Sequence, residues 1–141
     1  MVTFSSRIST SVKNNLTASM LAQEGIEVIR AIRDENWLAS PARAFYAGLN
    51  EEADGSTTIG RVQYDTSDSL LSQNDSAPLY LNANSGIYSY DSGDASPTFF
   101  KRKISITKVS AVELKVISEV TWTEAVRDRS VSVEDHLFDW K

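Results

Sequence analysis

The sequence predicts an α+β fold in which one long N-terminal helix packs on an antiparallel β-sheet. Apolar residues recur at steps of three and four over residues 1–40, as they do on one side of a helix, and alternate with polar residues over 97–141, as they do in half-buried strands. With 141 residues, 41% of them hydrophobic, the chain can bury one core. We therefore expect a single domain made of a helix (1–40), a loop-rich middle (41–96) and an antiparallel meander (97–141).

The predicted helix is uninterrupted, because no proline and a single glycine, Gly25, occur over residues 5–37. One apolar row recurs every three or four residues and is expected on one side of the helix: Phe4, Ile8, Val12, Leu16, Ala22, Ile26 and Ile29. A second row begins only in the C-terminal half and lies on roughly the opposite side: Leu21, Val28 and Ile32. We therefore expect the C-terminal half to be buried on two sides. Arg30 has Glu27 three residues before it and Asp34 four residues after it, spacings that favour ion pairs.

The middle of the chain loses the helical pattern. Pro41 and the polar stretch 48–55 end the helix. Residues 56–96 are rich in Ser, Asp, Asn, Thr and Gly, which favour turns. Three short pieces in this stretch are strand-like: Gly60–Tyr64, Pro78–Leu81 and Gly86–Tyr90. We expect them to form small edge strands or an ordered loop.

Three runs with a period of two follow one another near the C-terminus. The residues of one phase are Phe100, Arg102, Ile104 and Ile106, then Leu114, Val116, Ser118, Val120 and Trp122, then Val131, Val133, Asp135 and Leu137. Short polar connections join the runs, which is typical of an antiparallel meander. When a helix packs on a sheet, the apolar row of the helix and the apolar face of the sheet are both buried. We expect the basic cluster 101–103 on a solvated face or at a blunted strand edge.

Composition excludes several classes of function. The formal net charge of −5 provides no basic field for phosphate backbones, so we expect no nucleic-acid partner. The absence of cysteine excludes disulfides, thiolate zinc sites and thiol nucleophiles. No stretch approaches the roughly 20 apolar residues of a membrane span, and residues 1–10 lack the apolar segment of a signal peptide. Either the protein stays inside the cell, or its targeting segment has been removed.

The helical segment 21–37 and the strand runs 100–107, 116–124 and 129–140 together resemble PilV-like minor pilins of the type IV pilus. Residues 21–37, LAQEGIEVIRAIRDENW, resemble the part of the first pilin helix that follows the membrane segment. The runs 100–107, 116–124 and 129–140 resemble the closing strands of the same family. These runs cover roughly a third of the chain, and the middle carries no such resemblance.

The resemblance implies a prepilin-type protein whose hydrophobic first helix is inserted in the inner membrane and processed by a prepilin peptidase. The head, a helix against an antiparallel sheet, would be extracytoplasmic and would assemble with other pilins in a cell-surface pilus. The family's cleavage signal and its long apolar half-helix do not occur in this sequence. We therefore expect a truncated sequence with an added Met1, in which contact with the membrane depends on the missing segment.

The first half of the helix is the predicted subunit interface. It carries only a narrow apolar row that its own sheet cannot cover, so neighbouring helices of other pilin subunits would cover it. The interface residues that we expect are Phe4, Ile8, Val12 and Leu16. No cofactor is expected, and catalytic carboxylate pairs, phosphate-binding glycine loops and nucleophile elbows do not occur, so we expect no enzyme.

Two alternatives remain open at this stage. A pseudopilin of a type II secretion system has the same helix-and-sheet head. A secreted, adhesin-like module would instead bind a glycan or a protein through the Ser- and Asp-rich middle, with Tyr88 and Tyr90 as surface aromatics. The other aromatic residues, above all Trp122, are expected in the core.

Few residues suggest a metal site. Asp91 and Asp94 could provide oxygen ligands for Ca²⁺, but they lack the spacing of a calcium loop, and we expect solvated turns there. The single histidine, His136, lies in the strand phase opposite Leu137 and is expected to be exposed.

Overall fold

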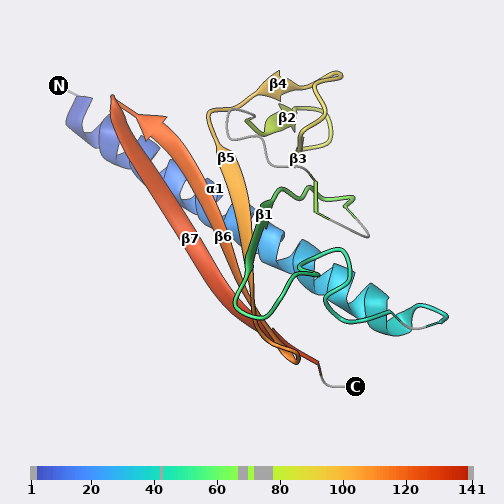
Figure 1. The fold of residues 1–141 in the computed structure, drawn as a ribbon. Helices are drawn as coiled ribbons and strands as arrows, with labels where there is room; N and C mark the ends of the chain where they lie inside the picture. Colours follow the sequence, from blue (N-terminus) through green and yellow to red (C-terminus); the bar gives the residue numbers. More distant parts are fainter. Residues whose placement is uncertain (1–2, 42, 67–69, 72–77, 140–141) are drawn as a thin grey trace.

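The computed structural model describes residues 3–41, 43–66, 70–71 and 78–139, and it has the predicted α+β architecture (Figure 1). Helix α1 (Thr3–Leu38) lies across one face of a four-stranded antiparallel sheet of order β1-β5-β6-β7. The strands of this main sheet are β1 (Thr57–Gly60), β5 (Lys101–Ser110), β6 (Glu113–Glu124) and β7 (Arg127–Phe138). A small sheet of order β3-β2-β4 is made of β2 (Tyr80–Asn82), β3 (Ile87–Ser89) and β4 (Ser96–Pro97).

The strand pairing places one phase of every run against the helix. Ile104, Ser118 and Val133 are in register across β5, β6 and β7, and their neighbours two residues away continue the same face. Arg102 to Lys108 on β5 and Leu114 to Trp122 on β6 alternate between buried and half-buried side chains. The predicted period of two is therefore confirmed.

The turn between β6 and β7 has two central residues with left-handed backbones. Ala125 has φ 47° and Val126 has φ 63°. A two-residue hairpin turn of this kind matches the twist of the strands that it joins. The side chain of Val126 is fully exposed. The turn lies beside the N-terminal part of α1 (Figure 1).

At Gly25 the helix backbone lies directly against the sheet. A Cβ atom at this position would lie 2.5 Å from Ser118 Oγ and 2.9 Å from Ile104 Cδ1. Neither distance is compatible with an unmoved side chain, so the sheet packs against helix backbone here. The single glycine of the helix thus sets the spacing between the two layers.

The C-terminal half of the helix is buried on two sides, as predicted. Ile29 and Ile32 are fully buried in one core cluster, which also holds Phe45 and Leu49 from the segment that follows the helix. Asn36 fixes that segment, because its Nδ2 donates to the carbonyls of Phe45 (3.1 Å) and Ala47 (2.9 Å). The sheet therefore covers one side and the following segment covers the other.

A second core cluster joins the main sheet to the small sheet. Its buried members are Ala18, Leu21, Ala22, Leu79, Phe100, Val120 and Trp122. The rings of Phe100 and Trp122 pack at a tilt of 56°, with centroids 5.7 Å apart. The prediction that Trp122 belongs to the core is confirmed, whereas Phe99 and Phe138 lie on the surface.

Arg102 corrects the expectation of a solvated basic cluster. Its side chain is fully buried between the helix and the sheet. One terminal nitrogen donates to the Leu21 carbonyl (2.7 Å) and to Glu24 Oε1 (2.9 Å), and the other donates to the Val62 carbonyl (2.7 Å). The guanidinium is tolerated because a carboxylate and two carbonyls satisfy most of its donors. Lys101, one residue earlier, is exposed as expected.

Two boundaries also differ from the predictions. The strand expected at Gly60–Tyr64 lies at Thr57–Gly60, where it pairs with β5 and adds a fourth strand to the meander. On the helix, Arg30 binds Glu27 (2.8 Å) as predicted, but its second partner is Asp135 of β7 (2.6 Å) rather than Asp34. A partner on another element cannot be found from helical spacing.

Candidate interaction surface

The N-terminal segment of the helix, residues 9–17, has no buried side chain. Its large apolar side chains face outward: Val12 is 53% exposed and Leu16 is 67% exposed. One turn further on, Met20 is 55% exposed on the same side. We call Val12, Leu16 and Met20 the outer stripe. Successive four-residue steps place these three side chains next to one another on the helix surface.

The prediction that Val12 and Leu16 lie on the same side of the helix as the buried residues Ala22, Ile26 and Ile29 is wrong. A four-residue step turns about 40° around the helix axis, and at 100° per residue Leu16 and Ile29 are about 140° apart. Leu16 therefore faces away from the sheet whereas Ile29 faces it. The predicted row joined Val12 and Leu16, before Ser19, to Ala22, Ile26 and Ile29, after it, although the two groups face different sides of the helix.

Of the four predicted interface residues, two have side chains that the structure describes. Val12 and Leu16 are exposed, as a subunit contact requires. The backbones of Phe4 and Ile8 are helical, and their side chains lie outside the described residues. Met20 was missed, although it continues the four-residue spacing from Leu16.

Polar contacts hold the N-terminal segment to the rest of the molecule. Glu124, at the end of β6, accepts hydrogen bonds from Ser11 Oγ (3.2 Å) and Asn14 Nδ2 (2.9 Å). Arg129 of β7 lies 3.4 Å from the same carboxylate. These contacts fix the direction of the segment on its inner side and leave the outer stripe exposed.

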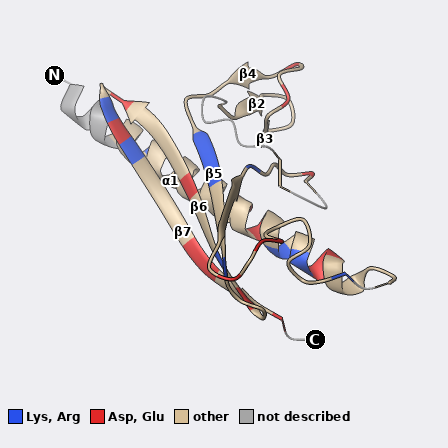
Figure 2. Ribbon diagram, in the orientation of Figure 1, with Lys and Arg blue, Asp and Glu red and all other residues tan. Residues whose placement is uncertain are grey.

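Charge is distributed unevenly around the helix. Figure 2 shows charged residues along the C-terminal half of α1 and along β7. On the outer side of residues 9–20, the only charged residue is Lys13. The surface around the outer stripe is therefore mainly small polar and apolar, as in contacts between helices.

Asp91 and Asp94, the calcium candidates, lie in a tight turn between β3 and β4 of the small sheet. Asp91 Oδ1 accepts the backbone N–H of Gly93 at 2.9 Å, and Asp94 has a left-handed backbone with φ 52°. Both features are common for Asp in turns. Among the residues that the structure describes, no group of three His, Asp or Glu side chains could hold a metal ion.

His136 is exposed, as predicted, and lies between two carboxylates. Its Nδ1 is 2.8 Å from Glu113 and its Nε2 is 3.0 Å from Glu134. Hydrogen bonds to Glu134 and then to Glu113 raise the pKa of His136 above its ordinary value of 6.5. The arrangement is a surface ion-pair group on the outer face of the sheet.

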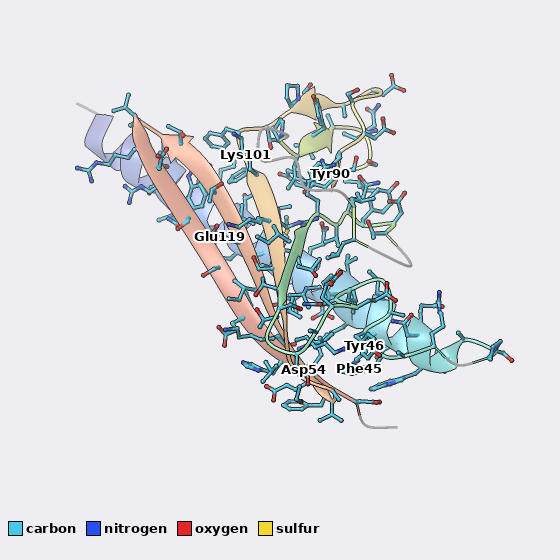
Figure 3. The ribbon with its side chains drawn as sticks, viewed as in Figure 1. Phe45, Tyr46, Asp54, Tyr90, Lys101 and Glu119 are labelled. Atoms are coloured by element: carbon cyan, nitrogen blue, oxygen red, sulfur yellow. The ribbon has the colours of Figure 1, made fainter. Side chains whose placement is uncertain are left out.

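Tyr88 and Tyr90 are not the surface aromatics that the adhesin-like alternative requires. Both are half-buried against the second core cluster. The hydroxyl of Tyr90 points to the Arg102 carbonyl at 3.4 Å, Arg61 covers its ring at 4.3 Å, and burial raises its pKa (Figure 3). These two rings attach the middle of the chain to the main sheet.

Comparisons of the chain with protein-family models, with curated proteins and with solved structures give no match. Within the described part of the chain, no helix combines the length and the apolar character needed to cross a membrane. Function is therefore inferred from the residues and their geometry.

Proposed function

We propose that this chain is the globular head of a type IV pilin-like protein, a minor pilin that acts as a structural subunit of a filament. The observation that carries the proposal is the outer stripe on a helix that is otherwise docked on its own sheet. Three large apolar side chains are each more than half exposed there: Val12, Leu16 and Met20. The resemblance of residues 21–37 to minor pilins supports the same assignment.

Association would bury the outer stripe. Full burial of a Val, Leu or Met side chain is worth about 1.5–3 kcal/mol. Rows spaced three and four apart pack into the grooves of a neighbouring helix. The expected partners are other pilin subunits, and the work of the protein is done by surfaces rather than by a reaction centre.

The helix is long enough to serve such an assembly. Its 36 residues span about 54 Å at 1.5 Å per residue, and among the side chains described from Ser9 onward the first buried one is Ala18. A preceding apolar half-helix would continue the same axis into the membrane before assembly. In this proposal the head is extracytoplasmic.

The type II secretion pseudopilin has the same arrangement and is the second candidate. The same exposed stripe favours it, because a pseudopilin also assembles through its first helix. Rescue experiments separate the two candidates. Restored pili in a strain lacking the gene would support a minor pilin, and restored secretion without pili would support a pseudopilin.

The experiment that tests the class is to read the native gene upstream of Thr3. We expect a Gly-Phe-x-x-x-Glu signal followed by about 20 apolar residues, enough to span a bilayer. A native protein that starts at Met1, with no apolar segment before the helix, would contradict the proposal.

A further inference from the structure

A hollow of about 460 Å³ lies at the main sheet near the ends of β6 and β7 that meet at the turn. Its lining includes Phe99, Lys101, Glu119, Thr121, Asp128 and Ser130. Lys101, Glu119 and Thr121 belong to the strand phase that faces away from α1, because the alternate residues are buried against the helix. Figure 3 labels Lys101 and Glu119 on this part of the sheet. The hollow is separate from the outer stripe.

One wall of the hollow is an aromatic ring that the core holds in place. Phe99 is 47% exposed, and its ring meets that of buried Phe100 edge-on, with centroids 4.7 Å apart and planes at 70°. Phe100 in turn packs on buried Trp122. The edge-on contact with Phe100 holds the Phe99 ring in place, and Phe100 is itself held by the core. The ring is a preformed apolar platform.

The other walls carry hydrogen-bonding groups in register. Lys101, Thr121 and Ser130 are paired across β5, β6 and β7, so they form one row. In the next row toward the turn, Thr123 Oγ1 donates to Asp128 Oδ1 at 3.0 Å. Hydroxyls donate and accept, carboxylates accept and an ammonium donates, so the hollow offers both kinds of partner.

From this combination we propose that the hollow binds a neutral glycan of about two sugar units. Strands are about 4.8 Å apart and residues on one face of a strand about 6.8 Å apart, so two rows on three strands cover roughly the area of a disaccharide. The C–H face of a sugar would stack on Phe99, and its hydroxyls would bond the polar rows. The lining carries Lys101 and Arg129 as well as Glu119 and Asp128, so its formal charges cancel, which suits a neutral ligand better than a charged one. This inference does not depend on the proposed function.

The first test is a glycan array. The folded chain is then titrated, with NMR detection, with the neutral disaccharides that bind on the array and, whatever the array shows, with lactose, maltose and diacetylchitobiose. We expect amide shifts at Phe99, Thr121 and Ser130. Phe99→Ala should weaken binding by about tenfold, the effect of losing roughly 1.4 kcal/mol of ring contact, and Phe99→Trp should retain it. Phe138→Ala is the matched control, because Phe138 is a surface ring of β7 (39% exposed) at the far end of the strand.

Several results would overturn the proposal. One such result is that no glycan on the array binds and that the amide chemical shifts do not change at high disaccharide concentration. The proposal would also be wrong if the amide shifts were confined to the small sheet, or if the Phe99 and Phe138 variants lost the same amount of binding affinity. Binding of short peptides and of no sugar in the hollow would contradict it too. Thermal unfolding of each variant separates loss of the ring from loss of the fold.

Discussion

The two segments of helix α1 differ in environment although they belong to one continuous helix. Between Ala18 and Asn36 the helix contributes buried side chains to both core clusters, and from Ser9 to Thr17 it has no buried side chain. Both segments have apolar residues at helical spacing. The comparison teaches that an apolar row predicts a contact but does not say whether the contact is made within the chain or with another one.

The largest expected difference comes from the same substitution in each segment. Leu21 is fully buried and Leu16 is 67% exposed, so Leu21→Ala and Leu16→Ala form a matched pair. We expect Leu21→Ala to lower the free energy of unfolding by about 2–5 kcal/mol through the cavity that it leaves. Leu16→Ala should change it by less than about 0.5 kcal/mol. Urea unfolding of both variants checks this, and equal losses would mean that the two segments are not different.

A second test concerns the close approach at Gly25. Gly25→Ala places a methyl group against Ser118 Oγ and Ile104 Cδ1 and should cost about 1–3 kcal/mol of stability by overpacking. Ser118→Ala removes one of the two obstacles, so the double variant should be more stable than the sum of the single effects predicts. Additive effects in a double-mutant cycle would show that the helix does not meet the sheet there.

A smaller effect is expected where the N-terminal segment is attached. Glu124→Ala removes the acceptor of Ser11 and Asn14 and should cost about 1 kcal/mol, because the hydrogen bonds are partly exposed. Amide hydrogen exchange should become faster over residues 9–17 and stay unchanged over 18–36. Faster exchange over the whole helix would contradict the independence of the two segments.

The smallest expected effect is on the outer face of the sheet. Because Glu134 and Glu113 raise the pKa of His136, protonation of this side chain favours the folded state. This contribution is fully present below the unfolded pKa of about 6.5 and is lost as pH rises through the higher folded pKa. NMR titration of the single histidine should give a pKa above 6.5 that falls in Glu134→Gln, with no change in the helix amides. A pKa at or below 6.5 would show that the carboxylates do not bind the ring.

The sequence was sufficient for the elements whose partners follow from periodicity. The alternation at Ile104 and Ile106 and the uninterrupted helix around Gly25 placed the main layers correctly. Arg102 was not predicted to be buried, because its carboxylate and carbonyl partners come from two distant parts of the chain, the helix and the segment after β1. Periodicity shows on which face of a helix or strand a residue lies, but not which groups form its hydrogen bonds and ion pairs there.

The candidate surface was predicted in part for a related reason. Val12 and Leu16 were recognised as a row, but the drift of a four-residue step turns that row away from the sheet, and its continuation to Met20 was overlooked. Tyr88 and Tyr90 looked like surface residues because turn-forming residues flank them. Their burial depends on the small sheet folding back on β5, which local sequence does not encode.

The most direct measurement is cysteine cross-linking of the outer stripe in the assembled filament. The chain has no cysteine, so Leu16→Cys and the control Ser132→Cys, which is exposed on β7, each introduce a single thiol. In cells that express the full-length protein, a short maleimide–diazirine reagent attached to the thiol should, on illumination, join Leu16→Cys to other pilin subunits and leave Ser132→Cys monomeric. Cross-linking at Ser132→Cys alone, or at neither position in intact filaments, would contradict the claim that the outer stripe is a subunit interface.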